Sequence, residues 1–365
     1  SLSYIKLRTE DSGAGSAVFG ARTVGDLFLL RDSFPQSTIS LVDIDKDRLD
    51  LVEAMTRKLN IQYGSPFTVQ ASTDRRAVLE GADFVVTSPA FEREDRWKID
   101  WDIISAAGIK QTYGENGGPG ALSHALRNIP VLLDIARDVE ALAPGAWVIN
   151  YTNPESRICM ALDRYTNLKF VGLCHQIWKG YELVSTITGV PEDDLDIKAG
   201  GLNHFTFMYS IHQKSTSTDL YPVVRQRFQS VLGDQEPLSC FMMDRFGIFP
   251  TSGDHHLAEM LSFGWEYQGL EGRDWQWWRN YKQEFLDWIT GVRDGSRELD
   301  EIVSSLSGER VAQMAAAILN NENSYEISMD VRNDGAVPNL PAAAIVEGPG
   351  MISAAGITPL RMPPL

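Results

Sequence analysis

The chain has 365 residues, of which 43% are apolar and 22% charged, and its formal net charge is −16. This length fits two domains that share an interface, and the composition is that of a globular, core-forming protein, not a disordered, collagen-like or disulfide-stapled one. The acidic balance argues against a nucleic-acid or anionic-membrane partner, because both require a cationic surface.

No stretch reaches the roughly 18 uninterrupted apolar residues of a membrane helix. The first eleven residues lack the basic and apolar parts of a secretory signal. The three cysteines, Cys159, Cys174 and Cys240, are too few and too odd in number for a disulfide framework. We therefore expect reduced thiols in a cytoplasmic protein, with Cys174 free to act as a ligand.

The first half of the chain alternates strand-like and helix-like segments, which predicts a doubly wound α/β domain. The strands are short runs rich in β-branched residues, and the helices have apolar residues at helical spacing. The predicted strands are residues 38–42, 67–71, 83–87, 147–151 and 169–173, and the predicted helices are residues 46–60, 74–80 and 122–142. Asn153-Pro154 predicts a turn after the fourth of these strands.

The second half is less regular and shows no internal repeat. Residues 197–202 and 205–211 are predicted strands, and residues 219–232, 254–261 and 311–320 are predicted helices. The tryptophan-rich residues 274–288 fit either a helix or a packed loop, and residues 335–341 a turn-rich loop. The abrupt ending at Leu365 suggests a second domain that is truncated.

A glycine-rich element, Gly13-Ala14-Gly15-Ser16, is typical of a turn that brings backbone close to a pyrophosphate at a helix N-terminus. Asp43 lies 28 residues after Gly15, at the end of the next predicted strand, where an acid accepts from ribose hydroxyls. The third glycine of the usual fingerprint is missing, and an isolated Gly-x-Gly is a weak signal. Together with the βαβ rhythm, these residues predict NAD binding.

The expected architecture is a Rossmann-like NAD-binding domain over residues 1–200, similar to lactate and malate dehydrogenases, followed by an α+β substrate- and metal-binding domain over residues 201–365. The segment Leu7-Arg8-Thr9-Glu10-Asp11 conflicts with this expectation, because it is too polar for a central buried strand. We therefore expect a first strand that is damaged, displaced or replaced, with a possible cost to NAD binding.

Two pairs of adjacent residues carry metal-ligand chemistry. Cys174-His175 ends a predicted strand, at the edge where open α/β sheets bind ligands, and Asn203-His204 separates two predicted strands. A thiolate and an imidazole both suit borderline divalent ions. Taken singly, Cys174 is more typical of a buried small apolar residue than of a ligand, and His204 also fits a core histidine.

Two further segments contain acid–base groups. Residues 112–120 form a glycine-rich loop whose strong acid is Glu115, although an ordinary connection has the same composition. Asp254, before His255 and His256, is either a functional carboxylate or a helix N-cap. Because adjacent helical residues point in different directions, we expect at most one of these two histidines to face a given site.

These residues, taken together, resemble glycoside hydrolase family 4 over nearly the whole chain. The motifs that carry the resemblance are Gly13-Ala14-Gly15-Ser16, Asn150-Tyr151-Thr152-Asn153-Pro154, Gly172-Leu173-Cys174-His175, Gly201-Leu202-Asn203-His204, and Asn339-Leu340-Pro341 with Val346-Glu347. This family is the NAD-dependent exception to two-carboxylate glycosidase chemistry.

The resemblance implies that NAD⁺ takes a hydride from C3 of a sugar, a base removes the proton at C2, and the leaving group departs from C1. A divalent ion, typically manganese in the family, would stabilise the charge that develops. The resemblance assigns metal binding to Cys174 and His204, substrate binding to Asn153 and Asn203, catalysis to Asp254 (as C2 base), Glu115 (assisting the leaving group) and His175, and cofactor binding to Gly13, Gly15, Ser16 and Asp43.

The substrate implied is an unphosphorylated glycoside, with an α bond and a uronide slightly ahead of a galactoside or glucoside. Residues 89–94 replace the Arg-Val-Gly-Gly stretch that accompanies phosphorylated substrates, and residues 253–259 resemble members that act on uronides. Two alternatives stay open: a plain NAD-dependent sugar or hydroxy-acid dehydrogenase, and a degenerate NAD-binding regulator. Family resemblance also implies a homodimer or homotetramer.

Overall fold

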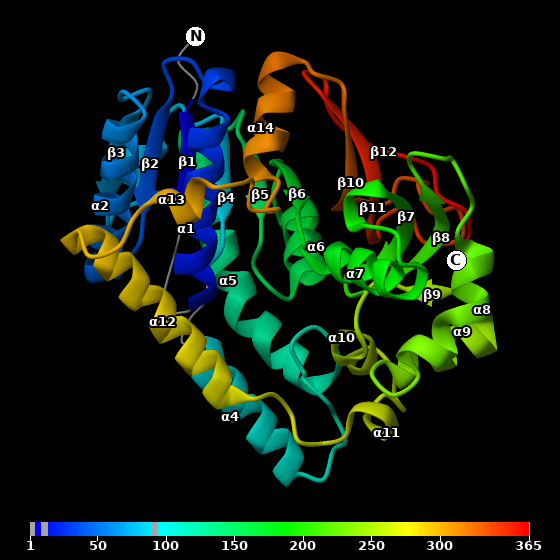
Figure 1. The fold of residues 1–365 in the computed structure, drawn as a ribbon. Helices are drawn as coiled ribbons and strands as arrows, with labels where there is room; N and C mark the ends of the chain where they lie inside the picture. Colours follow the sequence, from blue (N-terminus) through cyan, green and yellow to red (C-terminus); the bar gives the residue numbers. More distant parts are fainter. Residues whose placement is uncertain (1–3, 9–13, 90–92, 365) are drawn as a thin grey trace.

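The computed structural model describes residues 4–8, 14–89 and 93–364 of the chain. Its strands form one sheet in the order β3-β2-β1-β4-β5-β6-β10-β11-β7-β8-β9, with β12 paired to β11 (Figure 1). The strands are β1 Tyr4–Arg8, β2 Thr38–Val42, β3 Thr68–Ser72, β4 Phe84–Thr87, β5 Trp147–Asn150, β6 Lys169–Gly172, β7 Leu195–Leu202, β8 Phe205–Gln213, β9 Phe249–Pro250, β10 Ser324–Arg332, β11 Ile345–Ser353 and β12 Gly356–Pro359.

Every strand and helix predicted from the sequence is present, with ends shifted by a few residues. The helices are α1 Ala14–Leu29, α2 Lys46–Gln62, α3 Arg76–Leu79, α4 Arg93–Ala106, α5 Gly118–Leu142, α6 Glu155–Tyr165, α7 Gln176–Thr188, α8 Tyr221–Leu232, α9 Pro237–Phe246, α10 Asp254–Glu259, α11 Trp265–Gln268, α12 Trp275–Asp294, α13 Asp300–Val303 and α14 Val311–Asn320. None of these helices in the described ranges is long and apolar enough to cross a membrane.

The first six strands are parallel and are covered by helices on both faces. Side chains alternate across β4 and β5: Phe84 and Ile149 pack into the core shared with α1 and α2, whereas Val85 and Val148 pack into the core shared with α5 and α6. A parallel sheet buried on both faces requires such continuous apolar strands. The predicted Rossmann-like, doubly wound fold is confirmed.

The expectation that the first strand is damaged or displaced is wrong. Strand β1 lies in the middle of the parallel sheet, paired along its whole length with β2 and along four residues with β4. The strand ends at Arg8, inside the segment 7–11, so the last three residues of that segment are not part of the strand. Residues 9–13, including Gly13, lie outside the described residues, so their effect on NAD binding stays a prediction.

The C-terminal half of the chain extends the same sheet with antiparallel strands. Strands β7 and β8 form a hairpin, and the pair β10–β11 is inserted between β6 and β7 (Figure 1). Residues 274–288 adopt the helical alternative as part of α12, which packs against α1, α2 and α4 of the first half. Because both halves build one sheet, the predicted division at residue 200 into two domains stays a prediction.

One row of four residues crosses the place where the two halves of the sheet meet. Gly172 of β6 pairs with Asp330 of β10, Asp330 with Glu347 of β11, and Glu347 with Gly201 of β7. We call these four residues the seam row. A Cβ on Gly172 would lie 2.3 Å from Oε1 of Glu155, so only glycine leaves room for the acid beside it. The seam row therefore places two buried carboxyl groups directly beneath the ends of β6 and β7.

Candidate active site

A cavity of about 670 Å³ opens where several strands and their following loops end. Ser88 follows β4, Asn153 follows β5, Cys174 follows β6, and His204 lies between β7 and β8. This is the carboxyl edge of the parallel strands, where open α/β sheets bind ligands. Of the predicted site residues, the cavity wall includes Glu115, Asn153, Cys174, His175 and His204.

Cys174 and His204 approach each other across this cavity. Sγ of Cys174 lies 4.0 Å from Nε2 of His204. His204 belongs to the two-residue turn of the β7–β8 hairpin and has a φ of +63°, in the left-handed region that a non-glycine residue rarely adopts. Such backbone strain is found mainly at functional sites. Burial raises the pKa of the Cys174 thiol well above its ordinary value.

Asn203 determines which nitrogen of His204 carries the proton. The Asn203 amide donates two hydrogen bonds of 3.1 Å, one to Asp330 and one to Glu347 of the seam row. Its Oδ1 therefore faces Nδ1 of His204, at 2.5 Å, and must accept from it. The lone pair of His204 is left on Nε2, the nitrogen that faces Cys174.

Asn203 and Asp254, predicted as a substrate-binding and a catalytic residue, are not part of the cavity wall. Asn203 is buried behind His204, where it positions the imidazole. Asp254 is also buried, and its carboxylate accepts from the backbone N–H groups of Leu238 (2.6 Å) and Ser239 (2.7 Å). Asp254 thus caps the start of α9, which corresponds to the capping alternative but for a different helix. Burial raises the pKa of this carboxyl group.

Glu115 and Asn153 meet from two different loops. The Asn153 amide donates to Oε1 of Glu115 at 3.3 Å, and the Asn153 carbonyl accepts from Asn128 at 2.7 Å. Glu115 is almost fully buried yet belongs to the cavity wall. The pair therefore presents a carboxyl group and an amide, fixed relative to each other, to anything bound in the cavity.

At the start of α7, Nε2 of His175 contacts the carboxylate of Glu309. Its ring lies 5.9 Å from that of Tyr151, whose hydroxyl donates to the Glu309 carbonyl. About half of the His175 side chain is exposed, on the cavity side. Glu309 was missed in the sequence because it lies 134 residues downstream, in the segment before α14.

The expectation that only one of His255 and His256 faces a given site is wrong. Both histidines belong to the cavity wall, because the wall bends around the start of α10. The His255 ring stacks on Tyr113 at 5.3 Å, and the His256 ring meets the His204 ring edge-on at 4.4 Å.

Helix α12 and the residues before it close the far side of the cavity. No site residue was predicted in this segment, although its many tryptophans are the kind of side chain that can line a ligand cavity. The guanidinium of Arg273 stacks 3.6 Å above the ring of Trp278 and 4.5 Å above that of Trp97. The other wall residues that were not predicted include Arg22, Tyr151, Gln176, Lys179, Trp277, Tyr281 and Glu309.

The residues present fit the groups that the sequence predicts. A thiol and an imidazole whose lone pair is on Nε2 are a suitable donor pair for a borderline divalent ion. Among the described residues no group of three or more His, Cys, Asp or Glu side chains is arranged to hold a metal ion. On the NAD side, Gly15 and Ser16 lie in the first turn of α1, and Asp43 is buried at the end of β2. Gly13 lies outside the described residues.

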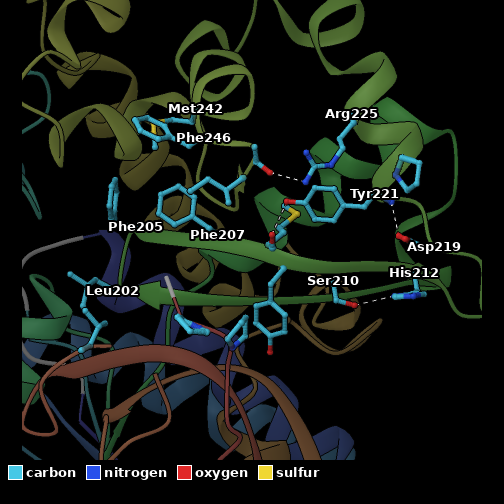
Figure 2. A pocket seen from close by; sticks show the side chains of 18 of the residues that line it. Leu202, Phe205, Phe207, Ser210, His212, Asp219, Tyr221, Arg225, Met242 and Phe246 are labelled. Carbon is cyan, nitrogen blue, oxygen red and sulfur yellow. Dashed lines mark hydrogen bonds between the residues drawn. The ribbon is translucent and has the colours of Figure 1, made fainter. Parts of the chain in front are cut away.

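A second cavity, of about 830 Å³, lies away from these residues, between β8 and helices α8 and α9. Figure 2 shows Phe205, Phe207 and Phe246 at one end of it and the hydrogen-bonded Ser210–His212 pair toward the other. None of the predicted site residues lines it. Its wall is mainly apolar, and its acid–base groups, His212 and Asp219, are not among the predicted site residues.

Comparison with known proteins agrees with the geometry. The model of the family described as "Family 4 glycosyl hydrolase" matches residues 11–189, and that of its C-terminal domain matches residues 199–365. The chain belongs to family 4 of the glycosyl hydrolases. It is thus related to enzymes that hydrolyse glycosidic bonds, as the sequence motifs predicted.

Individual relatives cover most of the chain. An alpha-glucosidase of Erwinia rhapontici is 32% identical over 94% of this chain and 82% of its own length. An alpha-galactosidase of Bacillus subtilis is 28% identical over 95% of this chain and 81% of its own. The structure of a 6-phospho-alpha-glucosidase from gut microorganisms, solved with NAD and Mn²⁺, superposes with a TM-score of 0.76 at 20% identity, over the whole of this chain and 85% of that one. This last likeness shows a shared fold.

Proposed function

We propose that this family member is an NAD- and manganese-dependent glycosidase that works by oxidation at C3 and elimination across C1 and C2. The observation that carries the proposal is the approach of Cys174 to the unprotonated Nε2 of His204 inside the cavity. A divalent ion held by this pair would act as a Lewis acid on sugar oxygens. The bound NAD and Mn²⁺ of the structurally similar 6-phospho-alpha-glucosidase support the choice of cofactors.

The side chains of the cavity supply the other functions. Asn153 and His175 lie where they can hold the hydroxyl groups of a sugar, and both are fixed by acidic neighbours, Glu115 and Glu309. Glu115, a carboxyl group of the cavity wall, would donate a proton to the leaving oxygen. The dinucleotide would be held by the first turn of α1 and by Asp43, whose carboxylate would accept from the ribose.

The substrate that we propose is an unphosphorylated α-glycoside. Two of the relatives described above, an alpha-glucosidase and an alpha-galactosidase, support this choice. Arg22, Lys179 and Arg273 are cations of the cavity wall that would receive the carboxylate of a uronide. The reduced cytoplasmic setting and a homodimer or homotetramer are proposed with it; light scattering after gel filtration measures the subunit number.

The test is hydrolysis of p-nitrophenyl α-glucoside, α-galactoside and α-galacturonide and of their β and 6-phospho counterparts. Each reaction is run with NAD⁺, Mn²⁺ and a thiol reductant, and again with one component removed. We expect turnover that requires all three and leaves no net NADH. Activity that survives removal of both NAD⁺ and metal would refute the mechanism.

The same assay separates the two alternatives. A plain sugar or hydroxy-acid dehydrogenase would release NADH in proportion to product, and a degenerate regulator would bind NAD without manganese-dependent turnover. A substrate deuterated at C2 adds an independent check, because proton removal there exchanges deuterium with ordinary water. Full retention of deuterium in the product would exclude a base at C2.

A further inference from the structure

Glu259 connects two parts of the cavity wall that are far apart in the sequence. It is the last residue of α10, and its side chain is almost fully buried. Oε2 accepts from three consecutive backbone N–H groups, those of Glu115 (2.8 Å), Asn116 (2.9 Å) and Gly117 (3.2 Å). Oε1 lies 3.1 Å from Nδ1 of His256. One carboxylate therefore fixes the loop that carries Glu115 and the imidazole of His256 together.

The loop and α10 also touch at the level of their backbones. A Cβ on Gly117 would lie 1.9 Å from the carbonyl oxygen of Glu259, which no real side chain tolerates. Gly117 is the N-cap residue of α5, so the carboxylate lies at the start of a long helix, where N–H groups point outward. The Glu259 carboxylate is thus bound by a concave group of backbone N–H donors, as an anionic ligand would be.

The same contact determines the proton of His256. A carboxylate offers only acceptors, so the nitrogen that faces it, Nδ1, must carry the hydrogen. In the neutral ring the lone pair then lies on Nε2, the nitrogen that does not face Glu259. His256 is part of the cavity wall, with its ring 4.4 Å from that of the proposed ligand His204 and 5.9 Å from that of Tyr113. A hydrogen-bond acceptor is therefore available in the cavity beside the proposed metal position.

We propose that Glu259 is a positioning residue that holds His256 with Nε2 unprotonated, and that His256 is the base at C2 of the sugar. The proposal rests on the proposed function of this cavity. His256 would thus take the role of C2 base that the sequence suggested for Asp254, whose carboxylate caps α9. In the step itself, the C2–H bond breaks, its electron pair moves toward the adjacent carbonyl of the oxidised sugar, and the proton passes to Nε2 of His256.

Glu259→Gln separates the two functions of the carboxylate. The amide oxygen of glutamine can still accept from the three loop N–H groups, so the loop stays in place. Its NH₂ group then faces Nδ1 of His256 and can only donate, which moves the histidine proton to Nε2. The direct readout is the ¹⁵N spectrum of protein labelled with ¹⁵N-histidine, with His256→Gln identifying the signal. We expect an Nδ1–H tautomer in the unmodified protein and an Nε2–H tautomer in Glu259→Gln.

The kinetic readout separates positioning from a general loss of structure. We expect kcat of Glu259→Gln to fall roughly 10²-fold, the usual size of a general-base effect, with KM little changed and exchange at C2 slowed in parallel. His256→Gln, which keeps a polar side chain but no base, should show a similar loss, and combining both changes should cost little more than either. Glu266→Gln, an exposed acid on the neighbouring α11, is the matched control and should leave kcat unchanged.

Two results would overturn the proposal: an unchanged His256 tautomer in Glu259→Gln, or turnover and C2 exchange by His256→Gln at the unmodified rate. Failure of the proposed function gives a different pattern. If the unmodified protein hydrolyses no glycoside but Glu259→Gln still switches the tautomer, the positioning by Glu259 stands and the role of His256 as C2 base falls with the glycosidase proposal.

Discussion

Cys174 and His204 illustrate how individual side chains are prepared for chemistry by neighbours that do not touch the substrate. The orientation of His204 depends on Asn203, and that of Asn203 on Asp330 and Glu347. Outer-shell partners of this kind fix the tautomer of a histidine ligand and raise its basicity. The Cys174 carbonyl is in turn held by Arg310 at 2.8 Å, so both candidate ligands are anchored to the strands behind them.

At the residue scale, Cys174→Ser should lower Mn²⁺ affinity and turnover together. A hydroxyl stays protonated where a thiol becomes a thiolate ligand, so the loss should exceed the roughly 10–100-fold typical of an outer-shell change. Isothermal titration with Mn²⁺ and kcat/KM measure the two effects. Cys240→Ser, the same chemical change in the core of the second half, is the control. Unmodified affinity in Cys174→Ser would show that the ligand assignment is wrong.

The second residue-scale prediction concerns Glu155, which is buried and has no hydrogen-bond partner for Oε1 among the described residues. Burial, with Asp330 and Glu347 nearby, raises its pKa well above the ordinary value. A carboxyl group whose pKa is raised by folding contributes its full stability below its unfolded pKa, and that stability is lost as pH rises through the folded pKa.

Glu155→Gln should therefore unfold less readily than the unmodified protein at alkaline pH, by about 1–3 kcal/mol, and its stability should decline less as pH rises. Urea unfolding at several pH values, with metal removed, measures the difference. The exposed Glu192→Gln should follow the unmodified protein. An equal decline in all three proteins would refute this account of Glu155.

At the scale of elements, the strands and helices that the sequence predicted are apolar along one face or throughout, although α6 and α7, which also bury an apolar face, were not predicted. The buried residues of helix α2 follow the helical period, whereas strands β2 and β4 are short runs buried at every position. Strands β10 and β11 were missed for a physical reason. Their buried positions include Glu326, Asp330 and Glu347. Acidic residues at buried positions break the regular series of apolar residues by which a strand is recognised in a sequence.

The element-scale prediction concerns the end of α12, which the first half of the chain caps. Nζ of Lys58 on α2 donates to the carbonyl oxygens of Val292 and Arg293, the latter at 2.7 Å. A cation at a helix C-terminus satisfies free carbonyl groups and interacts favourably with the helix dipole. Lys58→Met should lower the free energy of unfolding by about 1–2 kcal/mol.

Thermal unfolding measures this effect, with Lys46→Met as the control. Lys46 also lies on α2, but it is exposed and pairs only with Asp50 of its own helix among the ion pairs described. We expect no measurable change there. Because α12 carries Trp278 of the cavity wall, a raised KM should accompany the loss of stability in Lys58→Met.

At the scale of the whole molecule, five of the predicted site residues meet in one cavity, and the rest of its wall was not predicted. Motifs such as Gly172-Leu173-Cys174-His175 place residue types at strand ends, and the topology of a parallel sheet brings strand ends together. They do not show where a side chain points, so they could not indicate that Asp254 and Asn203 lie outside the cavity wall. Helix α12 becomes part of the cavity wall because it packs against helices that are distant in the sequence, and local sequence patterns do not show such contacts.

The whole-molecule prediction is a linkage between metal and stability. A ligand that binds only the folded chain stabilises it, by about 2.7 kcal/mol at a concentration of one hundred times its Kd. Mn²⁺ should therefore raise Tm, EDTA should reverse the rise, and Cys174→Ser should remove most of it. Differential scanning calorimetry measures all three. A Tm that ignores Mn²⁺ while NAD⁺ still raises it would argue for a nucleotide-binding protein without a metal centre.

The insertion of β10 and β11 between β6 and β7 also determines when the cavity can exist. Cys174 and His204 are synthesised before residues 324–353, which contain the two strands that lie between β6 and β7. Domains form from the N-terminus onward during synthesis, and contacts between distant segments form slowly. We therefore expect the parallel half to be able to fold while the chain is still growing, and the arrangement of Cys174 and His204 to form only after β10 and β11 have been added to the sheet. A newly made chain would then pass through a folded but inactive stage.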